Sequence, residues 1–151
     1  MKKYTIGLDY GTNSCRALIV DIDDGTELAS SVFLYPSGEN GIILDSSDPN
    51  LARQNPKDYL DGITATILGA IQKAKKNNPT FNSFNIVGIG VDTTGSSPIP
   101  VDKQGNPLSF SEKFKNNPNA MCWLWRDHTS FKEAQQITHL AEKIRPEYLA
   151  K

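Results

Sequence analysis

Cysteine and histidine are scarce in this chain of 151 residues, which contains two of each. Cys15 and Cys122 have no metal-ligand spacing and form no disulfide framework, so we interpret them as small core residues of a reduced, cytoplasmic protein. No apolar run approaches the roughly 20 residues that a membrane-spanning helix needs. The two lysines after Met1 lead into a strand-like segment rather than into a secretory apolar region. These absences argue against a membrane protein or a secreted protein.

An excess of charge of either sign is also lacking. The 16 basic and 17 acidic side chains leave a net charge of −1. Nucleic acids and anionic membranes are recognised by basic surfaces, so neither is an expected partner. With 38% hydrophobic residues, a chain of this length suffices for one domain with a packed core.

Three short apolar segments near the N-terminus predict an antiparallel meander. They span residues 4–9, 15–21 and 27–34, and Asp23-Asp24-Gly25 is typical of the hairpin turn between the second and the third. Residues 35–55 show no periodicity. A connection of this length is expected to be functional or covered by another part of the protein.

The rest of the chain alternates helices with buried strands. Asn55 as N-cap and Pro56 at the first helical position predict a helix over 56–76. The apolar run 85–92 then predicts a strand parallel to the earlier sheet. Further strands are expected at 99–101 and 121–125, and a further helix at 130–144. The pattern predicts an α/β fold with a mixed sheet whose parallel strands are joined by crossover helices.

Apolar positions that recur at helical spacing predict the buried face of each helix. In the first helix these are Tyr59 or Leu60, Ile63, Ile67, Leu68 and Ile71. In the second they are Phe131, Ala134, Ile137, Leu140, Ala141 and Ile144.

Three of the predicted strands end in a polar cluster. The clusters are residues 9–14, 92–97 and 126–129. Parallel neighbouring strands place their carboxyl ends at one edge of a sheet, where open α/β sheets bind ligands. If the three strands are parallel neighbours, one cleft is lined by all three clusters.

The first cluster has the groups that a metal-bound phosphate needs. Asp9 offers a carboxylate to a metal ion, Gly11 permits close backbone approach, and Arg16 adds a fixed positive charge. The hydrogen-bond donors are Thr12, Asn13 and Ser14. Ordinary hairpin turns use the same residue types, and Arg16 also fits a solvated strand position, so a plain turn remains the alternative.

The other two clusters suit a small sugar. The second offers small polar groups that fit the hydroxyls of a polyol but also occur in ordinary loops, namely Thr94, Gly95 and Ser96. Trp125 lies close enough to a strand end to form one wall of a sugar pocket, and core packing is the alternative. It is expected on the same side of the strand as Trp123. Asp127 and His128 suggest acid–base chemistry. We favour the alternative in which Asp127 or Thr129 caps the following helix and His128 packs at its start.

Three stretches taken together resemble the FGGY family of carbohydrate kinases. Residues 6–21, IGLDYGTNSCRALIVD, are similar to the family's first phosphate motif. Residues 87–100, VGIGVDTTGSSPIP, and 116–129, NNPNAMCWLWRDHT, resemble the sugar-side loops of its L-ribulokinases, with Arg126 where lysine is expected. The resemblance implies a ribonuclease H-like fold, shared with actin and the heat-shock chaperone ATPases.

The resemblance also implies ATP and Mg²⁺ as cofactors and assigns residues to them. Asp9 would coordinate Mg²⁺ through water. The β- and γ-phosphates would lie near Gly11, Thr12, Asn13 and Ser14, with Arg16 in support. The sugar pocket would be lined or supported by Thr94, Gly95, Ser96, Trp125 and Asp127. Phosphoryl transfer depends on positioning and on neutralising charge, and these residue types suit that work.

The activity implied by the resemblance is the ATP-dependent phosphorylation of L-ribulose to L-ribulose 5-phosphate in arabinose breakdown. A kinase of another pentulose, such as D-ribulose or xylulose, is the first alternative, because few contacts set stereochemistry. A non-catalytic, actin-like ATP-binding domain is a second, against which the two sugar-side loops argue. A structural module with a coincidental phosphate motif is a third, against which the three clusters argue.

Members of this family have two domains, and residues 1–151 would form only part of the first. The resemblance places the catalytic base and the adenosine pocket beyond this range. We therefore expect no catalytic base here, and the isolated chain is expected to be inactive. Apolar surface left uncovered would favour a homo-oligomer.

Overall fold

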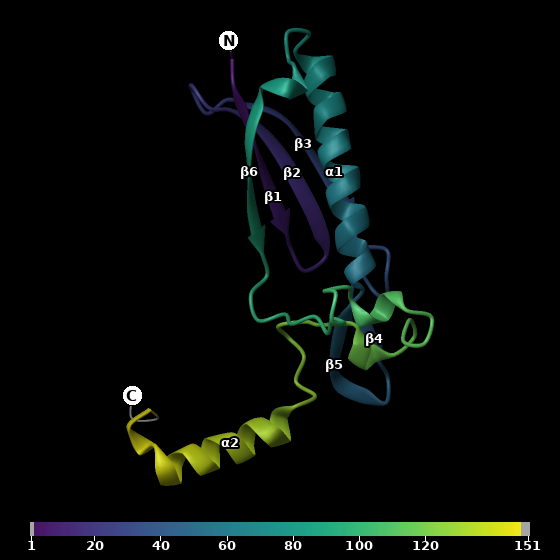
Figure 1. The fold of residues 1–151 in the computed structure, drawn as a ribbon, viewed down its shortest axis with the longest axis vertical. Coiled ribbons are helices and arrows are strands. Elements are labelled where there is room, and N and C mark those ends of the chain that lie inside the picture. Colours follow the sequence, from purple (N-terminus) through teal and green to yellow (C-terminus); the bar gives the residue numbers. More distant parts are fainter. Residues whose placement is uncertain (1, 149–151) are drawn as a thin grey trace.

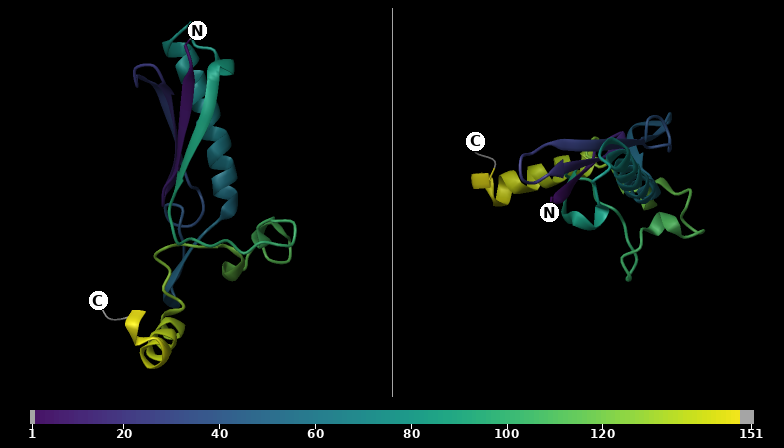
Figure 2. Two further views of the ribbon diagram at one scale, coloured as in Figure 1. Left: turned by 60° about the vertical axis from the view of Figure 1, so that its left-hand side comes forward. Right: turned by 90° about the horizontal axis from the view of Figure 1, so that it is seen from above.

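The computed structural model describes residues 2–148, which form two β-sheets, a long helix against the larger sheet and a second helix that extends away (Figures 1 and 2). The larger sheet has the strand order β3-β2-β1-β6. Its strands are β1 (Tyr4–Tyr10), β2 (Ser14–Asp21), β3 (Glu27–Leu34) and β6 (Ile86–Thr93). Strands β1 to β3 form an antiparallel meander, and β6 pairs parallel to β1. The predicted α/β fold with a mixed sheet is confirmed.

Helix α1 (Pro56–Asn77) carries the chain from the second sheet back along the first to the start of β6. The Asn55 side chain accepts a hydrogen bond from the Lys57 backbone N–H at 3.0 Å, and Pro56 occupies the first turn. At the other end, the backbone N–H of Asn78 donates to the Ala74 carbonyl at 2.9 Å. The cap residues thus start the helix as the sequence predicts and end it one residue later.

The face of α1 that lies closest to the sheet differs from the predicted one. Its fully buried positions are mostly small side chains: Gly62, Thr66, Ala70 and Ala74. A Cβ atom added to Gly62 would lie 2.8 Å from Cys15 Cβ, so the helix is too close to the sheet for a larger residue. The large apolar residues that flank this line pack against the core as predicted, with Tyr59 rather than Leu60 on the buried side, but Leu68 is exposed, contrary to the prediction.

A second sheet lies beyond the N-terminal end of α1, and it corrects the prediction for residues 35–55. Strands β4 (Ile43–Asp45) and β5 (Asp48–Gln54) fall in the segment interpreted as a connection without periodicity, and β7 (Cys122–Trp123) completes the order β4-β5-β7. The last four residues of β5 are all buried. Because both faces of β5 are covered there, its sequence shows no alternation of polar and apolar residues.

The prediction of three parallel neighbouring strands is wrong for residues 121–125. Strand β7 pairs antiparallel with β5, with Trp123 opposite Arg53 and Cys122 opposite Gln54. The chain leaves the strand after Trp123, so Trp123 and Trp125 do not share a side of one strand. Residues 99–101 also form no strand, and only the bridge from Val101 to Pro107 is present. An apolar run indicates burial but does not specify a pairing partner.

Helix α2 (Phe131–Ile144) forms close to its predicted bounds, but none of its residues is buried. Its apolar positions face solvent within the described part of the chain, and Ile137 is 69% exposed. Four short 3₁₀ helices complete the secondary structure of the described residues: Ser83–Asn85, Leu108–Phe110, Pro118–Ala120 and Pro146–Tyr148. Between residues 2 and 148 there is no helix of sufficient length and apolar character to cross a membrane.

Because α1 lies so close to the sheet, adding one methyl group at Gly62 is expected to destabilise the fold. Gly62→Ala is expected to lower the free energy of unfolding by about 1–2 kcal/mol, because overpacking costs more than the gain of up to ~1 kcal/mol in helix propensity. Gly69→Ala is the matched control, since its Cβ would first meet the rotatable hydroxyl of Ser31. Urea unfolding of both variants measures the difference. A Gly62→Ala variant as stable as Gly69→Ala would contradict the packing described.

Candidate functional site

The turn between β1 and β2 lies where the larger sheet meets the second one (Figure 1). Gly11 closes it by donating its backbone N–H to the Ser14 carbonyl at 2.9 Å. Ser14 is buried, Thr12 is half-buried and Asn13 is exposed. The Asn13 side chain donates to the Asn40 carbonyl at 2.6 Å, which ties the tip of the turn to the loop after β3. The turn is therefore ordered by its neighbours and leaves donors accessible.

Carboxylates from β1 and β6 lie beside each other at the same end of the sheet. Asp9 and Asp92 are register partners in the parallel pair, so both side chains are on one face. Leu8 and Ala17 face α1, so this pair lies on the opposite face. Arg16 is the antiparallel partner of Asp9, with its Nη1 atom 3.5 Å from Asp9 Oδ2. Asp9 is 47% exposed, which leaves its carboxylate open to a further ligand.

The face that carries these carboxylates is hollowed. The hollow has a volume of about 610 Å³, and Asp9, Arg16 and Asp92 lie at one end of it. Gly7 and Gly90 are register partners in its floor, and a Cβ atom on either would meet nothing within 4 Å. The glycines therefore keep this surface open next to the turn.

The loop after β6 is held against the turn by its backbone. The Thr94 N–H donates to the Tyr10 carbonyl at 3.1 Å, one residue before Gly11. Ser96 has φ of 54°, a left-handed conformation that is uncommon outside glycine, and it is exposed. Thr94 and Ser97 line a smaller hollow of about 230 Å³ together with Tyr10, Tyr59, Thr93, Ile99 and Cys122. The first and second polar clusters are thus adjacent, as expected for the ends of parallel strands.

Trp125, the residue directly before the third cluster, reaches the same place by a different route. Its backbone N–H donates to Ser97 Oγ at 3.1 Å, and its indole Nε1 donates to Thr12 Oγ1 at 3.2 Å. The side chain is 55% exposed. The residue lies in a turn after β7 rather than at the end of a strand of the larger sheet. Trp125 therefore reaches the site although the strand pairing predicted for residues 121–125 is wrong, whereas Asp127 of the third cluster is bound to Arg53 and Ala52.

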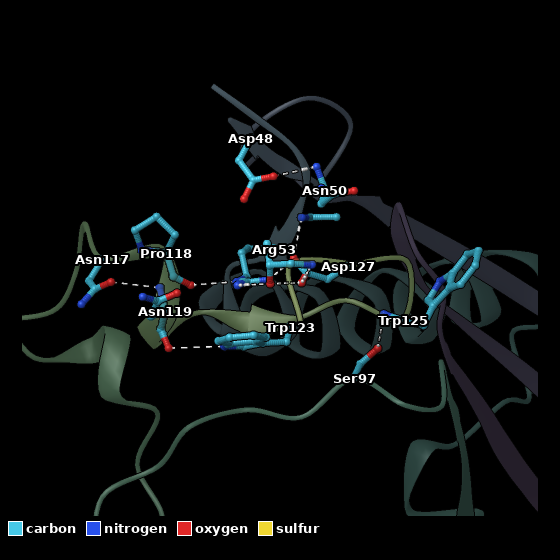
Figure 3. A network of polar contacts seen from close by, with 12 residues as sticks. Asp48, Asn50, Arg53, Ser97, Asn117, Pro118, Asn119, Trp123, Trp125 and Asp127 are labelled. Carbon is cyan, nitrogen blue, oxygen red and sulfur yellow. Dashed lines mark hydrogen bonds and ion pairs between the residues drawn. The ribbon is translucent and has the colours of Figure 1, made fainter. Parts of the chain in front are cut away.

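Asp127 supports this arrangement and points away from the turn (Figure 3). Its carboxylate pairs with Arg53 Nη1, and both side chains are at most 3% exposed. It also accepts hydrogen bonds from the backbone N–H of Ala52 at 2.7 Å and of Thr129 at 3.1 Å. Burial lowers the pKa of the Arg53 guanidinium, but arginine remains protonated and needs this counter-charge. His128 is exposed, and its backbone N–H donates to the Asn50 carbonyl at 2.9 Å.

Arg53 also contacts the segments on either side of β7. Its guanidinium carbon lies 3.6 Å from the centre of the Trp123 ring, and its Nε donates to the Pro118 carbonyl at 3.2 Å. The Trp123 indole donates to the Asn119 carbonyl at 3.4 Å. One buried cation therefore connects β5, β7 and the asparagine-rich turn before β7.

Sequence reasoning missed Arg53 and Gln54, because both lie in the segment that shows no periodicity. Gln54 is 1% exposed and donates from Nε2 to the Thr12 carbonyl at 2.6 Å. A carbonyl can only accept, so Gln54 Oε1 faces the Tyr59 hydroxyl, 2.7 Å away. Burial raises the pKa of that hydroxyl, so it stays protonated and donates. The available signal was a pair of polar residues, Arg53-Gln54, directly before the helix cap.

The residues present fit Mg²⁺ bound together with a phosphate. Mg²⁺ is held by oxygen atoms and commonly by only one or two carboxylates, with water and phosphate completing its shell. Asp9 and Asp92 supply two carboxylates, and residues 11–14 supply donors for phosphate beside them. Within residues 2–148 there is no group of three or more His, Cys, Asp or Glu side chains that could hold a metal ion.

Two solved structures with the same fold are sugar kinases. Gluconate kinase from Lactobacillus acidophilus matches with a TM-score of 0.69 and 21% identity, over 93% of this chain and 23% of its own. Xylulose kinase from Lactobacillus acidophilus matches with a TM-score of 0.68 and 22% identity, over 92% and 23% respectively. At these identities the likeness establishes the fold alone: this is the α/β fold of sugar kinases.

The family follows from the sequence comparison. Residues 4–147 match the FGGY family of carbohydrate kinases, N-terminal domain, and the chain belongs to that family. The ribulokinase of Vibrio parahaemolyticus is 43% identical over 140 residues, which are 93% of this chain and 24% of that protein. The ribulokinase of Shouchella clausii is 36% identical over 155 residues, 100% of this chain and 27% of that protein. The chain spans about a quarter of the length of these curated relatives.

The buried ion pair predicts a large loss of stability when one partner is neutralised. Asp127→Asn is expected to lower the free energy of unfolding by about 3–5 kcal/mol, because Arg53 remains buried without a counter-charge. Asp61→Asn is the matched control: it breaks the exposed pair with Lys57 and should cost less than about 1 kcal/mol. The double variant Arg53→Met/Asp127→Asn removes both charges and should lose less stability than Asp127→Asn alone. Urea unfolding measures the stability of all three variants. Equal losses of unfolding free energy in Asp61→Asn and Asp127→Asn would contradict a buried ion pair between Arg53 and Asp127.

Proposed function

We propose that this chain is the sugar-side part of an ATP-dependent kinase that phosphorylates L-ribulose to L-ribulose 5-phosphate, a step of arabinose breakdown. The observation that carries the proposal is the contact between Thr12 in the phosphate-type turn and Trp125 in the loop that resembles the family's sugar side. Identity of 43% to a ribulokinase supports the choice of substrate. A kinase requires the two ligands to be adjacent, and these two clusters are adjacent.

On the phosphate side, each residue has a proposed role that suits its position. Asp9, with Asp92 beside it, holds Mg²⁺ through water. The turn at Gly11, Thr12, Asn13 and Ser14 faces the β- and γ-phosphates with backbone and side-chain donors, and Arg16 adds positive charge. Mg·ATP supplies the transferred phosphoryl group and neutralises its developing charge. The protein contributes hydrogen-bond donors and the positive charge of Arg16. The turn that carries these donors is held in place by neighbouring residues before the ligand binds.

On the sugar side, Thr94, Gly95, Ser96 and Trp125 form the wall of the proposed pocket. Thr94 and Trp125 are held beside the turn by hydrogen bonds to Tyr10, Ser97 and Thr12. Gly95 and Ser96 are exposed in the same loop. Asp127 contributes by fixing this loop rather than by contact with a ligand. The exposed indole face suits the apolar face of a small sugar.

The remaining parts of the reaction are assigned to other regions of the protein. None of the residues placed at the site is proposed as the base for the sugar hydroxyl. The related ribulokinases are about four times as long as the matched region. We propose that residues 1–151 are part of the first domain and that the base and the adenosine pocket come from the regions beyond it. Residues 1–151 alone are then inactive.

Substrate preference is the direct test of the proposed activity. The intact protein is expected to release ADP faster with L-ribulose than with D-ribulose, xylulose or glycerol. A coupled ADP-release assay over these four sugars and polyols measures it, with a sugar-free reaction as the control. Preference for D-ribulose or xylulose would leave a pentulose kinase but reject L-ribulose, and preference for glycerol would reject the pentulose assignment altogether.

The role of Asp9 is tested by removing its charge. Asp9→Asn in the intact protein is expected to lower kcat about 10- to 100-fold, because a carboxylate that holds Mg²⁺ through water acts as an outer ligand. Sugar affinity, measured by calorimetry without nucleotide, should not change. Asp61→Asn on the exposed surface of α1 serves as the control for loss of one carboxylate. Unchanged turnover in Asp9→Asn would show that Asp9 is only structural.

A further inference from the structure

Thr12 is contacted by side chains on two different sides of the turn. Its carbonyl accepts from Gln54 Nε2 at 2.6 Å, and its hydroxyl lies 3.2 Å from Trp125 Nε1. Gln54 is 1% exposed and is itself held by the Tyr59 hydroxyl, whereas Trp125 is 55% exposed. The backbone of Thr12 is thus fixed from the buried side, while its hydroxyl is held from the side that is open to ligands.

The bond from Trp125 determines what the Thr12 hydroxyl can do. An indole N–H only donates, so Thr12 Oγ1 is the acceptor in this contact. A hydroxyl has a single proton, which is therefore free to be donated elsewhere. Non-bridging phosphate oxygens accept hydrogen bonds. A Thr12 hydroxyl that accepts from Trp125 is consequently oriented as a donor towards such an oxygen.

We propose that Trp125 is a positioning residue for the phosphate turn: its indole N–H orients the Thr12 hydroxyl to donate to a phosphate oxygen of the nucleotide. This inference rests on the proposed function and gives Trp125 a role beyond the sugar wall. The two roles use different parts of the residue, because a sugar packs on the ring face and Thr12 is bound at the ring edge. The backbone N–H of Trp125 also donates to Ser97 Oγ, so its position depends on the sugar-side loop.

The consequence is a physical link between the two ligands. Gln54 leaves little freedom to the Thr12 backbone, so a displacement of the Trp125 ring acts on the Thr12 hydroxyl rather than on the whole turn. A sugar that holds the ring in place therefore favours the donor orientation. Nucleotide and sugar binding should then each strengthen the other, since such coupling is reciprocal.

Trp125→Phe separates the two roles, because phenylalanine keeps an aromatic face and lacks the N–H. In the intact protein, this change is expected to lower kcat/KM for Mg·ATP about two- to tenfold, the effect of one hydrogen bond, with a smaller change in KM for the sugar. Thr12→Val should lower kcat/KM for Mg·ATP by a similar factor, whereas Thr12→Ser, which keeps the hydroxyl, should retain the activity of the unmodified protein. Trp125→Phe should add no further loss in the Thr12→Val background. Trp123→Phe is the matched control, since its indole donates to Asn119 and not to Thr12.

Trp125 fluorescence tests the contact without reference to turnover. Residues 1–151 contain two tryptophans, so in a chain of these residues Trp123→Phe leaves Trp125 as the only tryptophan. In that background, Thr12→Val should change the emission of Trp125, because its N–H loses an acceptor. Unchanged emission would overturn the inference even in an active kinase.

The kinetic outcomes distinguish this inference from the proposed function. Additive effects of Trp125→Phe and Thr12→Val, or a change confined to KM for the sugar, would overturn the positioning role while leaving the kinase activity established. Absence of turnover with every sugar in the unmodified protein would overturn the proposed function and this inference with it.

Discussion

The buried guanidinium of Arg53 is the constraint on which the second sheet and its loops depend. A cation that is 1% exposed requires a counter-charge and acceptors for its N–H groups. Asp127, 74 residues further along the chain, provides the charge, and the same carboxylate binds the backbone of Ala52 and Thr129. The segment between β7 and α2 therefore has little freedom. Trp125 lies within this segment, so the pairing of Arg53 decides where the indole ring meets the turn.

Much of the fold could be predicted because its signals are local. Asn55-Pro56 mark the start of α1, and the bounds of β3 are those predicted from its apolar run and turn. The errors concern pairing between distant segments. The run at 121–125 is apolar whether it joins the larger sheet or β5, and β5 lacks alternation because both of its faces are buried. Likewise, the pattern of α2 predicts a helix with an apolar face but not what covers that face.

The candidate site could be predicted in part for the same reason. Residues 9–16 form one hairpin, so their proximity follows from the sequence, and the β1–β6 pairing brings residues 92–97 beside them. Asp127 was assigned to the site, but a side chain that lines a pocket and one that supports its wall are indistinguishable until partners are known. Gln54 and Arg53 were missed because their partners, Thr12 and Asp127, are 42 and 74 residues away. Such contacts leave no periodic signal.

The N-terminal end of α1 is what holds the two halves of the site together. Strand β5 of the second sheet runs directly into the helix cap, while the helix itself packs on the larger sheet. Asp58 in the first turn is buried and accepts hydrogen bonds from Ser37 Oγ at 2.9 Å and Ser37 N at 3.1 Å, which ties the loop after β3 to the same point. Gln54 and Tyr59 flank this junction: Gln54 donates to the Thr12 carbonyl, and the Tyr59 hydroxyl donates to Gln54. The phosphate-type turn is therefore positioned by the same few residues that join the sheets, while the Arg53–Asp127 pair positions the segment that carries Trp125, so the spacing between the phosphate and sugar sides depends on both.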